Sequence, residues 1–500
     1  MENLGQKMSA PSTSSGLKNR IFDPRFVFWW SIVWGIGIMA LSPLVNYITP
    51  LLNPAYANQW TPDIYWRLVM YWHGGIFIPW ITALAVLVYV VFKLDSIKGI
   101  SGRLLKDSIL IGGFVAVPVA GVAGLFDVYD NFALGVPLWT QIFAFLIGDE
   151  MAVALVLAML NKPRQSGKGF RSEGLAYYTV ILAIISAIFA AVMGHIGGWI
   201  SWFGPWPSVV PQYINYTLYS SLGFYNSTAV VTFTENVVGS HSHLMVASLM
   251  AGVIGLVASY FGYDNRWKGT SKGLSAIGFA IMIVGLLSAL WVYIVSGVGN
   301  YAIPTLFESG PNGIAFDDIL TGVVGFGGLF VLVGLLLYSK NNTNGGERIL
   351  LRDPLFISAI VAWLLIYLVV PITGYYIELN ESYFSAAGLS FDQAFTRFHQ
   401  DFGFFVLPPL VTLVLGLFTF GLTGRAKRTV AYLLLSGEVI AFVFGEIYSM
   451  VDLNTIFLII AIFGGLLMGI GAVGGAISVA ARPQRVAVTM ASQVTKYEGA

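Results

Sequence analysis

The sequence predicts an all-α integral membrane protein, and three observations lead to this fold class. Of the 500 residues, 57% are hydrophobic and only 10% are charged, whereas a soluble chain carries about 25% charged residues. The apolar residues form long runs of roughly 20, which is the length that an α-helix needs to cross a hydrocarbon layer of about 30 Å. Strands of an outer-membrane barrel would instead alternate apolar and polar positions. Water is therefore excluded as the main solvent of this chain.

We expect about twelve transmembrane helices in three groups of four, which form a single membrane domain over residues 27–480. The predicted spans are 27–48, 68–92, 108–126, 138–160, 175–201, 240–262, 274–297, 316–338, 355–377, 400–422, 430–450 and 454–480. An inner polar tail (1–26), a long outer loop (203–239) and an inner C-terminal tail (481–500) complete the predicted organisation.

The basic residues predict the orientation of these spans. With the N-terminus inside, all of the 26 Lys and Arg residues except Arg67 and Arg397 lie on the inner side. Cytoplasmic segments carry such an excess of positive charge, so we expect both termini inside and the protein in the plasma membrane of a prokaryote. The two exceptions are either interfacial residues whose charged ends reach toward water or clamps for an anionic group.

The composition also excludes several classes of function. Because the chain contains no cysteine, disulfides, thiolate-bound zinc, iron–sulfur clusters and covalent c-type haem attachment are excluded within it. A net charge of +1 gives no indication of a nucleic-acid partner. No nucleotide-binding motif is present, which excludes an ATPase on this chain.

The predicted topology places every histidine of the chain at the outer end of a helix. There are five: His73, His195, His241, His243 and His399. An ionisable side chain in a spanning segment is costly and by default marks a functional site. A single histidine at a helix end is often only an interfacial polar residue. Five on one side of the membrane instead indicate that these histidines are ligands of a metal or of haem iron.

His241 and His243 are the most informative of these residues. Residues two apart on a helix point about 200° apart around its axis. The two imidazoles therefore cannot easily bind one metal from the same face. Their spacing suits two macrocycles on opposite faces of one helix.

The run GSHSHLMVASLMAGVIGL, which contains this pair, resembles the His-x-His helix of catalytic subunits of the haem–copper oxidase and nitric oxide reductase superfamily. Members of that family have a twelve-helix core with threefold pseudo-symmetry and a haem-binding histidine near the outer start of helix 2, where His73 lies here. This chain departs from the family because the pair lies on the sixth predicted helix instead of the tenth. It also lacks the adjacent His-His of the family's copper site.

The resemblance implies that His241 and His243 are axial ligands of two haems, expected to be b-type. His73 and His399 would then be the opposite ligands, in a pairing that the sequence leaves open. A copper ion held by three histidines is not expected from this inventory.

Three further residues receive roles from the same resemblance. Arg67 and Arg397 would bind haem propionates where these emerge at the outer surface. His195 is left without an iron. It could bind a non-haem metal, donate a hydrogen bond to a propionate, or be an interfacial residue.

Four carboxylates within the predicted spans form a second group of candidates: Asp149, Glu150, Glu438 and Glu446. They are either buried structural groups or parts of a proton path or quinone site. Glu438 and Glu446 are eight residues apart and lie on similar faces of one helix, which suits a relay. Asp149 and Glu150 are adjacent and therefore point to different faces.

The sequence thus predicts a haem-binding respiratory oxidoreductase subunit that passes electrons through two haems between a membrane quinol and an outer-side acceptor. Its expected partners are the lipid bilayer, a quinol or an outer-side electron-transfer protein, and other subunits of a respiratory complex. An alternative is a reductase of oxygen or nitric oxide with one open haem. From another class, a twelve-helix secondary transporter would use Asp149 and Glu150 as a coupling-ion site, although transporters place their chemistry near the membrane midplane.

Overall fold

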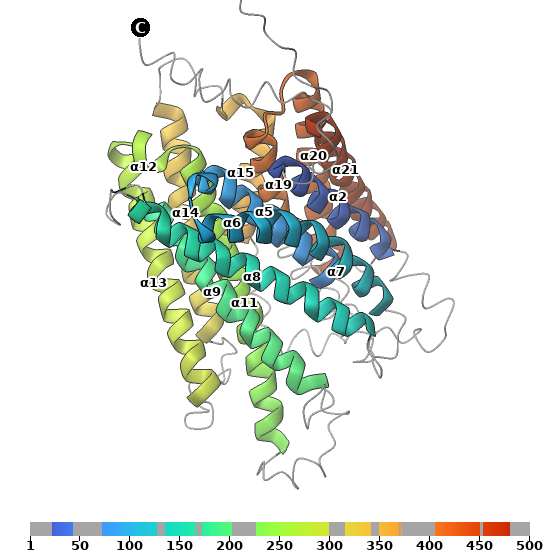
Figure 1. Cartoon of the computed structure of the whole chain (residues 1–500). Helices are drawn as coiled ribbons and strands as arrows, with labels where there is room; N and C mark the ends of the chain where they lie inside the picture. Colours follow the sequence, from blue (N-terminus) through green and yellow to red (C-terminus); the bar gives the residue numbers. More distant parts are fainter. Residues whose placement is uncertain are drawn as a thin grey trace, which may run out of the picture.

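The structure is a computed structural model of the chain (Figure 1). It describes residues 23–43, 73–127, 136–165, 167, 173–202, 227–299, 316–341, 350–369, 372, 406–450 and 454–480. These residues are almost entirely helical, and none of them lies in a β-strand. The predicted all-α fold class is confirmed for this part of the chain.

The helices follow the apolar runs of the sequence, and each predicted span overlaps at least one of them. In chain order they are α2 (Pro24–Pro43), η3 (His73–Phe77), α5 (Ile78–Val91), η4 (Leu94–Ser96), α6 (Ile100–Asp107), η5 (Ser108–Gly112), α7 (Gly113–Asp127), α8 (Val136–Gln165), α9 (Leu175–Trp202), α11 (Ser227–Tyr260), α12 (Tyr263–Arg266), α13 (Gly269–Gly299), α14 (Phe316–Asn341), η9 (Leu350–Arg352), α15 (Pro354–Leu364), η10 (Leu365–Val369), α19 (Leu407–Thr419), α20 (Gly424–Met450) and α21 (Thr455–Ala480). Within the described residues, nine helical segments are long and apolar enough to cross a membrane. The length and the apolar composition of these helices are those of an all-α membrane protein.

Local sequence signals set the ends of several helices. After α11, Gly262 adopts a left-handed φ of 80°, which a residue with a Cβ atom rarely adopts. At the start of α15, the Asp353 carboxylate accepts a hydrogen bond from the backbone N–H of Leu355 at 3.1 Å. The same carboxylate pairs with Lys427, so it also ties α15 to the first turn of α20.

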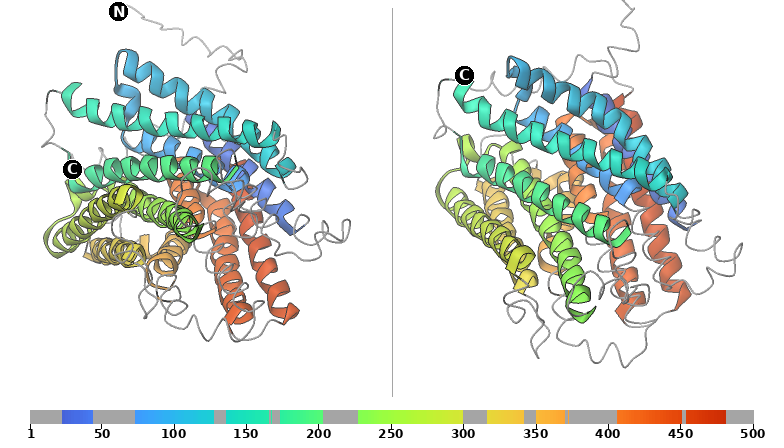
Figure 2. Two further views of the ribbon diagram at one scale, coloured as in Figure 1. Left: turned by 90° about the horizontal axis from the view of Figure 1, so that it is seen from below. Right: turned by 60° about the horizontal axis from the view of Figure 1, so that its bottom comes forward.

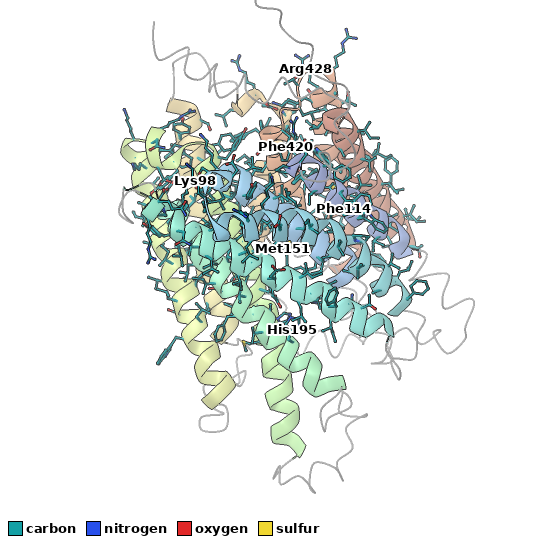
Figure 3. All side chains as sticks on the ribbon, viewed as in Figure 1. Lys98, Phe114, Met151, His195, Phe420 and Arg428 are labelled. Carbon is teal, nitrogen blue, oxygen red and sulfur yellow. The ribbon has the colours of Figure 1, made fainter. Side chains whose placement is uncertain are left out.

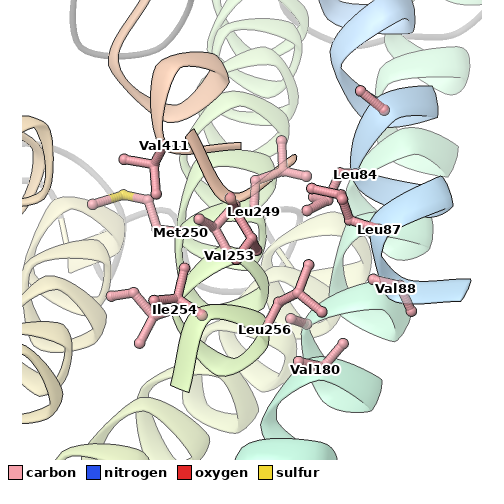
Figure 4. Close-up of a cluster of buried hydrophobic side chains, with 14 of the residues drawn as sticks. Leu84, Leu87, Val88, Val180, Leu249, Met250, Val253, Ile254, Leu256 and Val411 are labelled. Atoms are coloured by element: carbon pink, nitrogen blue, oxygen red, sulfur yellow. The ribbon is translucent and has the colours of Figure 1, made fainter. Parts of the chain in front are cut away.

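Helices α5 and α11 form the centre of the bundle. In each of them 78% of the most apolar window is buried, against 22% in α21 at the periphery. Figure 4 shows Leu84 and Leu87 of α5 in one cluster with Leu249 and Leu256 of α11 and Val411 of α19. His73 lies in the turn η3 (His73–Phe77) directly before α5, and His241 and His243 lie on α11. The buried core therefore positions the candidate site.

Helices at the periphery expose apolar side chains. The pair α13 and α14 lies on one side of the bundle and the pair α20 and α21 on another, as the views in Figures 1 and 2 agree. On α13, Val284, Leu287 and Trp291 expose 61%, 52% and 68% of their surface. Apolar outward faces of this kind are suited to hydrocarbon rather than to water.

One predicted boundary differs from the structure. The outer loop was expected to end at residue 239, but α11 already begins at Ser227 and is 34 residues long. His241 and His243 therefore lie near the middle of a long helix, not at its start. The polar residues before this pair interrupt the apolar run, yet nothing in them prevents helix formation, since a helix can continue beyond the apolar layer.

Candidate functional site

Two of the five histidines come together at the centre of the bundle. The ring centroids of His73 and His241 lie 6.3 Å apart, and their ring planes are 22° from parallel. His73 opens η3, a π-helical turn that leads into α5. Such turns are rare and are frequently found at functional sites. The structure thus pairs the histidine of the second predicted span with the first histidine of the His-Ser-His motif.

The backbone of α9 holds the imidazole of His241. Its Nδ1 atom lies 2.6 Å from the carbonyl oxygen of Ala190. Because a carbonyl oxygen only accepts hydrogen bonds, Nδ1 carries the proton and Nε2 keeps its lone pair. Hydrogen bonds of this type fix the tautomer and orientation of metal-binding histidines. His241 is therefore prepared to bind a metal through Nε2.

Two glycine residues allow close packing around the histidine pair, one against the ring of His241 and one next to His73 in the chain. A Cβ atom on Gly194 of α9 would lie 2.6 Å from Cε1 of His241. A Cβ atom on Gly74, the residue after His73, would lie 2.3 Å from the carbonyl oxygen of Ala120. Both distances are shorter than non-bonded atoms tolerate, so a larger residue would displace one of the packed groups.

His195 lies close to this pair and is bound to a carboxylate. Its Nε2 atom is 2.7 Å from Oδ2 of Asp149, and the two side chains are 28% and 27% exposed. The ring of Phe145 lies 6.3 Å from the ring of His73 and 6.3 Å from that of His195. Three of the five histidines thus gather at one place between η3, α8, α9 and α11.

Figure 3 shows where this place lies along the height of the bundle. His195 is well below Lys98 and Arg428, two basic residues that were predicted to lie inside. The histidine cluster and these basic residues are therefore separated along the bundle. The direction of the chain across a membrane stays a prediction.

The remaining candidate ligands are only partly described. His243 lies two residues beyond His241 on α11 and is partly buried. Its spacing turns it about 200° around the helix axis, away from the face that His241 occupies. His399, Arg67 and Arg397 lie outside the described residues.

Two histidines are enough protein ligands for a haem iron but too few for a bare metal ion. In the described part of the chain, no group of three or more His, Cys, Asp or Glu side chains could hold a metal ion. A haem iron needs only two protein ligands, on opposite sides of the macrocycle. An imidazole nitrogen binds a transition metal at about 2.0–2.1 Å and lies roughly 1 Å from its ring centre, so two such ligands place their ring centres roughly 6 Å apart. The ring centres of His73 and His241 are 6.3 Å apart, which agrees with this distance, and haem binding by the pair stays a prediction.

Asp149 and Glu150 have separate environments on α8. Asp149 faces α9, where it pairs with His195. Glu150 accepts a hydrogen bond from the hydroxyl of Ser108 at 2.6 Å and is exposed on the outside of the helix. The prediction that these two carboxylates point to different faces is confirmed by their different partners.

Glu438 is fully buried between α20 and α15. Its side chain has 0% exposure, and Oε2 accepts a hydrogen bond from the hydroxyl of Ser358 at 3.2 Å. Its other oxygen, Oε1, has no hydrogen-bond partner among the residues that the structure describes. Glu446 lies eight residues further along α20 and is partly buried. A relay between the two stays a prediction.

Sequence patterns missed the groups that hold the histidines in place. The Ala190 carbonyl, the Phe145 ring and the Ser108 hydroxyl carry no motif, because their roles depend on which helices become neighbours. Gly194 had a partial signal, since it directly precedes His195 in a run of small residues. A glycine in a spanning helix often marks a close approach of another helix.

Comparisons of the chain with protein-family models, with curated proteins and with solved structures found no match. Its function must therefore be argued from the chemistry of the site itself.

Proposed function

We propose that this chain is the haem-binding subunit of a respiratory membrane oxidoreductase. It would pass electrons through two b-type haems between a membrane quinol and an acceptor on the outer side. The observation that supports this function is the pair of near-parallel imidazoles of His73 and His241, 6.3 Å apart at the centre of the bundle. The proposal includes twelve transmembrane helices, both termini inside, and a prokaryotic plasma membrane in which the haem side faces outward.

Each described residue of the site has a role in this proposal. His73 and His241 would hold the haem iron, and the Ala190 carbonyl would keep the Nε2 lone pair of His241 available to it. Gly194 lets α9 pack closely on the ring of His241, and Gly74 lets the turn that carries His73 pack on Ala120 and Gln141. A bound haem supplies an iron that takes up and releases one electron. With both imidazoles bound to it, the haem would serve electron transfer and not the binding of a gas.

The second haem centre of this proposal is inferred from the sequence. His243 lies on the other face of α11 and would bind a second iron, with His399 as its opposite ligand. Arg67 and Arg397 would hold propionates through charge-assisted hydrogen bonds. Both arginines are the exceptions to the charge asymmetry, and this role explains their position.

A second candidate function is the reduction of oxygen or nitric oxide at an iron with an open position. The observation that favours it is the ion pair of His195 and Asp149 beside His73. An ionisable pair next to a redox centre can deliver a proton to a reduced substrate.

Quantification of haem in the purified protein tests both candidates. The haem would be measured as its pyridine complex, and carbon monoxide would be added to the dithionite-reduced protein. About two haems per chain without a spectral response to carbon monoxide support electron transfer through six-coordinate irons. A response of one haem supports the reductase. Absence of haem contradicts both and favours a secondary transporter.

A further inference from the structure

The outward face of α8 carries one carboxylate within an apolar stripe. Phe143, Leu146, Val153 and Leu157 expose 59%, 53%, 44% and 47% of their surface. Glu150 is exposed between Leu146 and Val153. The steps between these positions alternate between three and four residues, so all of them lie on one side of the helix.

Glu150 lies near the middle of this helix. Because α8 extends from Val136 to Gln165, about 20 Å of helix flanks Glu150 on either side. Within the described residues, its one hydrogen-bond donor is the hydroxyl of Ser108. The hydrogen bond to Ser108 thus orients the carboxyl group. At this depth, a single copy of the chain would expose the group to lipid.

The other carboxylates deep in the described helices are better covered. Glu438 has 0% exposure and Asp149 is paired with His195 at 27% exposure. Helix α13 provides a second comparison, since its outward stripe has the same spacing and contains no charged residue. That stripe consists of Ile277, Ala280, Val284, Leu287 and Trp291. Glu150 therefore distinguishes the α8 face from an ordinary lipid-facing surface.

Hydrocarbon offers no hydrogen-bond partner to a carboxyl group, so such a group at mid-membrane requires cover from another polar group. The closest complement of a carboxylic acid is a second carboxylic acid, because each has one O–H donor and one C=O acceptor. A two-fold axis between identical helices brings the same residue of both chains together. We infer that two copies of this chain pack through their α8 faces, with the two Glu150 side chains paired across the axis.

The apolar part of the stripe suits this arrangement. Alternating steps of three and four residues are the spacing at which two parallel helices interlock along their length. Phe143, Leu146, Val153 and Leu157 would pack against their counterparts in the other copy. Ser108, which is 5% exposed, would hold one oxygen of each Glu150 at the edge of this interface. This inference does not depend on haem binding.

Cysteine cross-linking tests the inference, because the chain contains no cysteine of its own. Leu146→Cys and Val153→Cys place a thiol on the stripe on either side of Glu150. Leu287→Cys on α13 is a matched control, with 52% exposure against 53% for Leu146. After oxidation in membranes at low expression, we expect covalent dimers of the two α8 variants and none above background for the α13 variant.

A second pair of variants tests the role of the carboxyl group. In the Leu146→Cys background, Glu150→Gln keeps a donor and an acceptor and should preserve the cross-linked fraction. Glu150→Leu removes both and should lower that fraction several-fold, with a single elution peak in detergent as the check on folding. Equal cross-linking of the α8 and α13 faces, absence of any cross-link, or cross-linking of α8 only to another polypeptide would overturn the proposal. The cysteine variants alone decide this if the leucine variant does not fold.

Discussion

His195 Nε2 lies 2.7 Å from Asp149 Oδ2, and this contact joins α9 to α8 beside the ring of Phe145. It accounts for the histidine that the sequence could not assign to an iron. Among the described residues no three His, Cys, Asp or Glu side chains are grouped so that they could hold a metal ion, so His195 borders the His73–His241 pair as a neighbour.

The pair of His195 and Asp149 predicts an energetic coupling between α8 and α9. Asp149→Asn, His195→Gln and the double variant form a thermodynamic cycle. We expect a coupling of about 0.5–1 kcal/mol, low for a charged hydrogen bond because both side chains are about one quarter exposed. Thermal unfolding in detergent, followed by intrinsic fluorescence, gives this value. Strictly additive effects of the two substitutions would show that the contact contributes nothing to stability.

We predict that adding a side chain at Gly194 disturbs the packing of the His241 ring. Gly194→Ala adds a methyl group about 2.6 Å from the ring of His241, which must shift that ring or α9. We expect a loss of about 1–3 kcal/mol in unfolding free energy and a lower haem content per chain. Gly465→Ala on α21 is the control, since a Cβ there meets nothing within 4 Å. Equal behaviour of both variants would contradict the close approach at His241.

We predict that substitutions of Ser358 and Glu438, which are hydrogen-bonded in the core, have non-additive effects on stability. Ser358→Ala removes the hydroxyl donor and leaves a buried carboxyl without a partner, which we expect to cost about 1–3 kcal/mol of stability. Adding Glu438→Leu should recover most of this loss, because a buried polar group is replaced by an apolar one. The unfolding temperatures of the single and double variants measure the effect. A double variant less stable than Ser358→Ala would argue against it.

We predict that the stability of the protein depends on pH through Asp264, which lies between α11 and α13. Burial raises the pKa of its carboxyl above the usual value and Glu173 raises it further, whereas Lys272 and Lys162 oppose the shift. The folded state therefore binds more protons than the unfolded state above the unfolded pKa of about 3.9. Stability is lost as pH rises through this window, up to the folded pKa.

Asp264→Asn removes this loss. The stability of the variant relative to the unsubstituted protein should therefore increase as pH rises from about 4 toward neutrality. Unfolding temperatures at several pH values, with Asn265→Ala as a neighbouring control, measure the trend. A difference that does not change with pH would mean that the Asp264 carboxyl titrates alike in both states.

Much of the fold could be predicted because apolar runs and helices have the same physical cause. A chain in lipid must satisfy its backbone hydrogen bonds internally, and the described part of each apolar run is mainly helical. The different faces of Asp149 and Glu150 followed from helix geometry alone. The start of α11 could not be predicted in this way, since Ser227 lies in a polar segment with no periodic signal.

The site was harder to predict because it depends on which helices become neighbours. The sequence marked His73 and His241 as candidates, but only the packing of α5 against α11 shows that their rings lie 6.3 Å apart. The link between His195 and Asp149 likewise joins residues from two helices with no shared motif. Backbone carbonyls such as that of Ala190 are present at every residue and carry no sequence signal.

The central claim is that His73 and His241 bind the same iron. Electron paramagnetic resonance of the oxidised, purified protein tests it, because axial imidazoles with near-parallel planes give a rhombic low-spin signal, unlike perpendicular ones. We predict this signal and about two haems per chain in the unsubstituted protein and in His195→Gln. Each of His73→Ala and His241→Ala should lose the signal of this centre and keep about one haem, that of His243 and His399. Two haems with unchanged low-spin signals in either alanine variant, or a protein without haem, would contradict the claim.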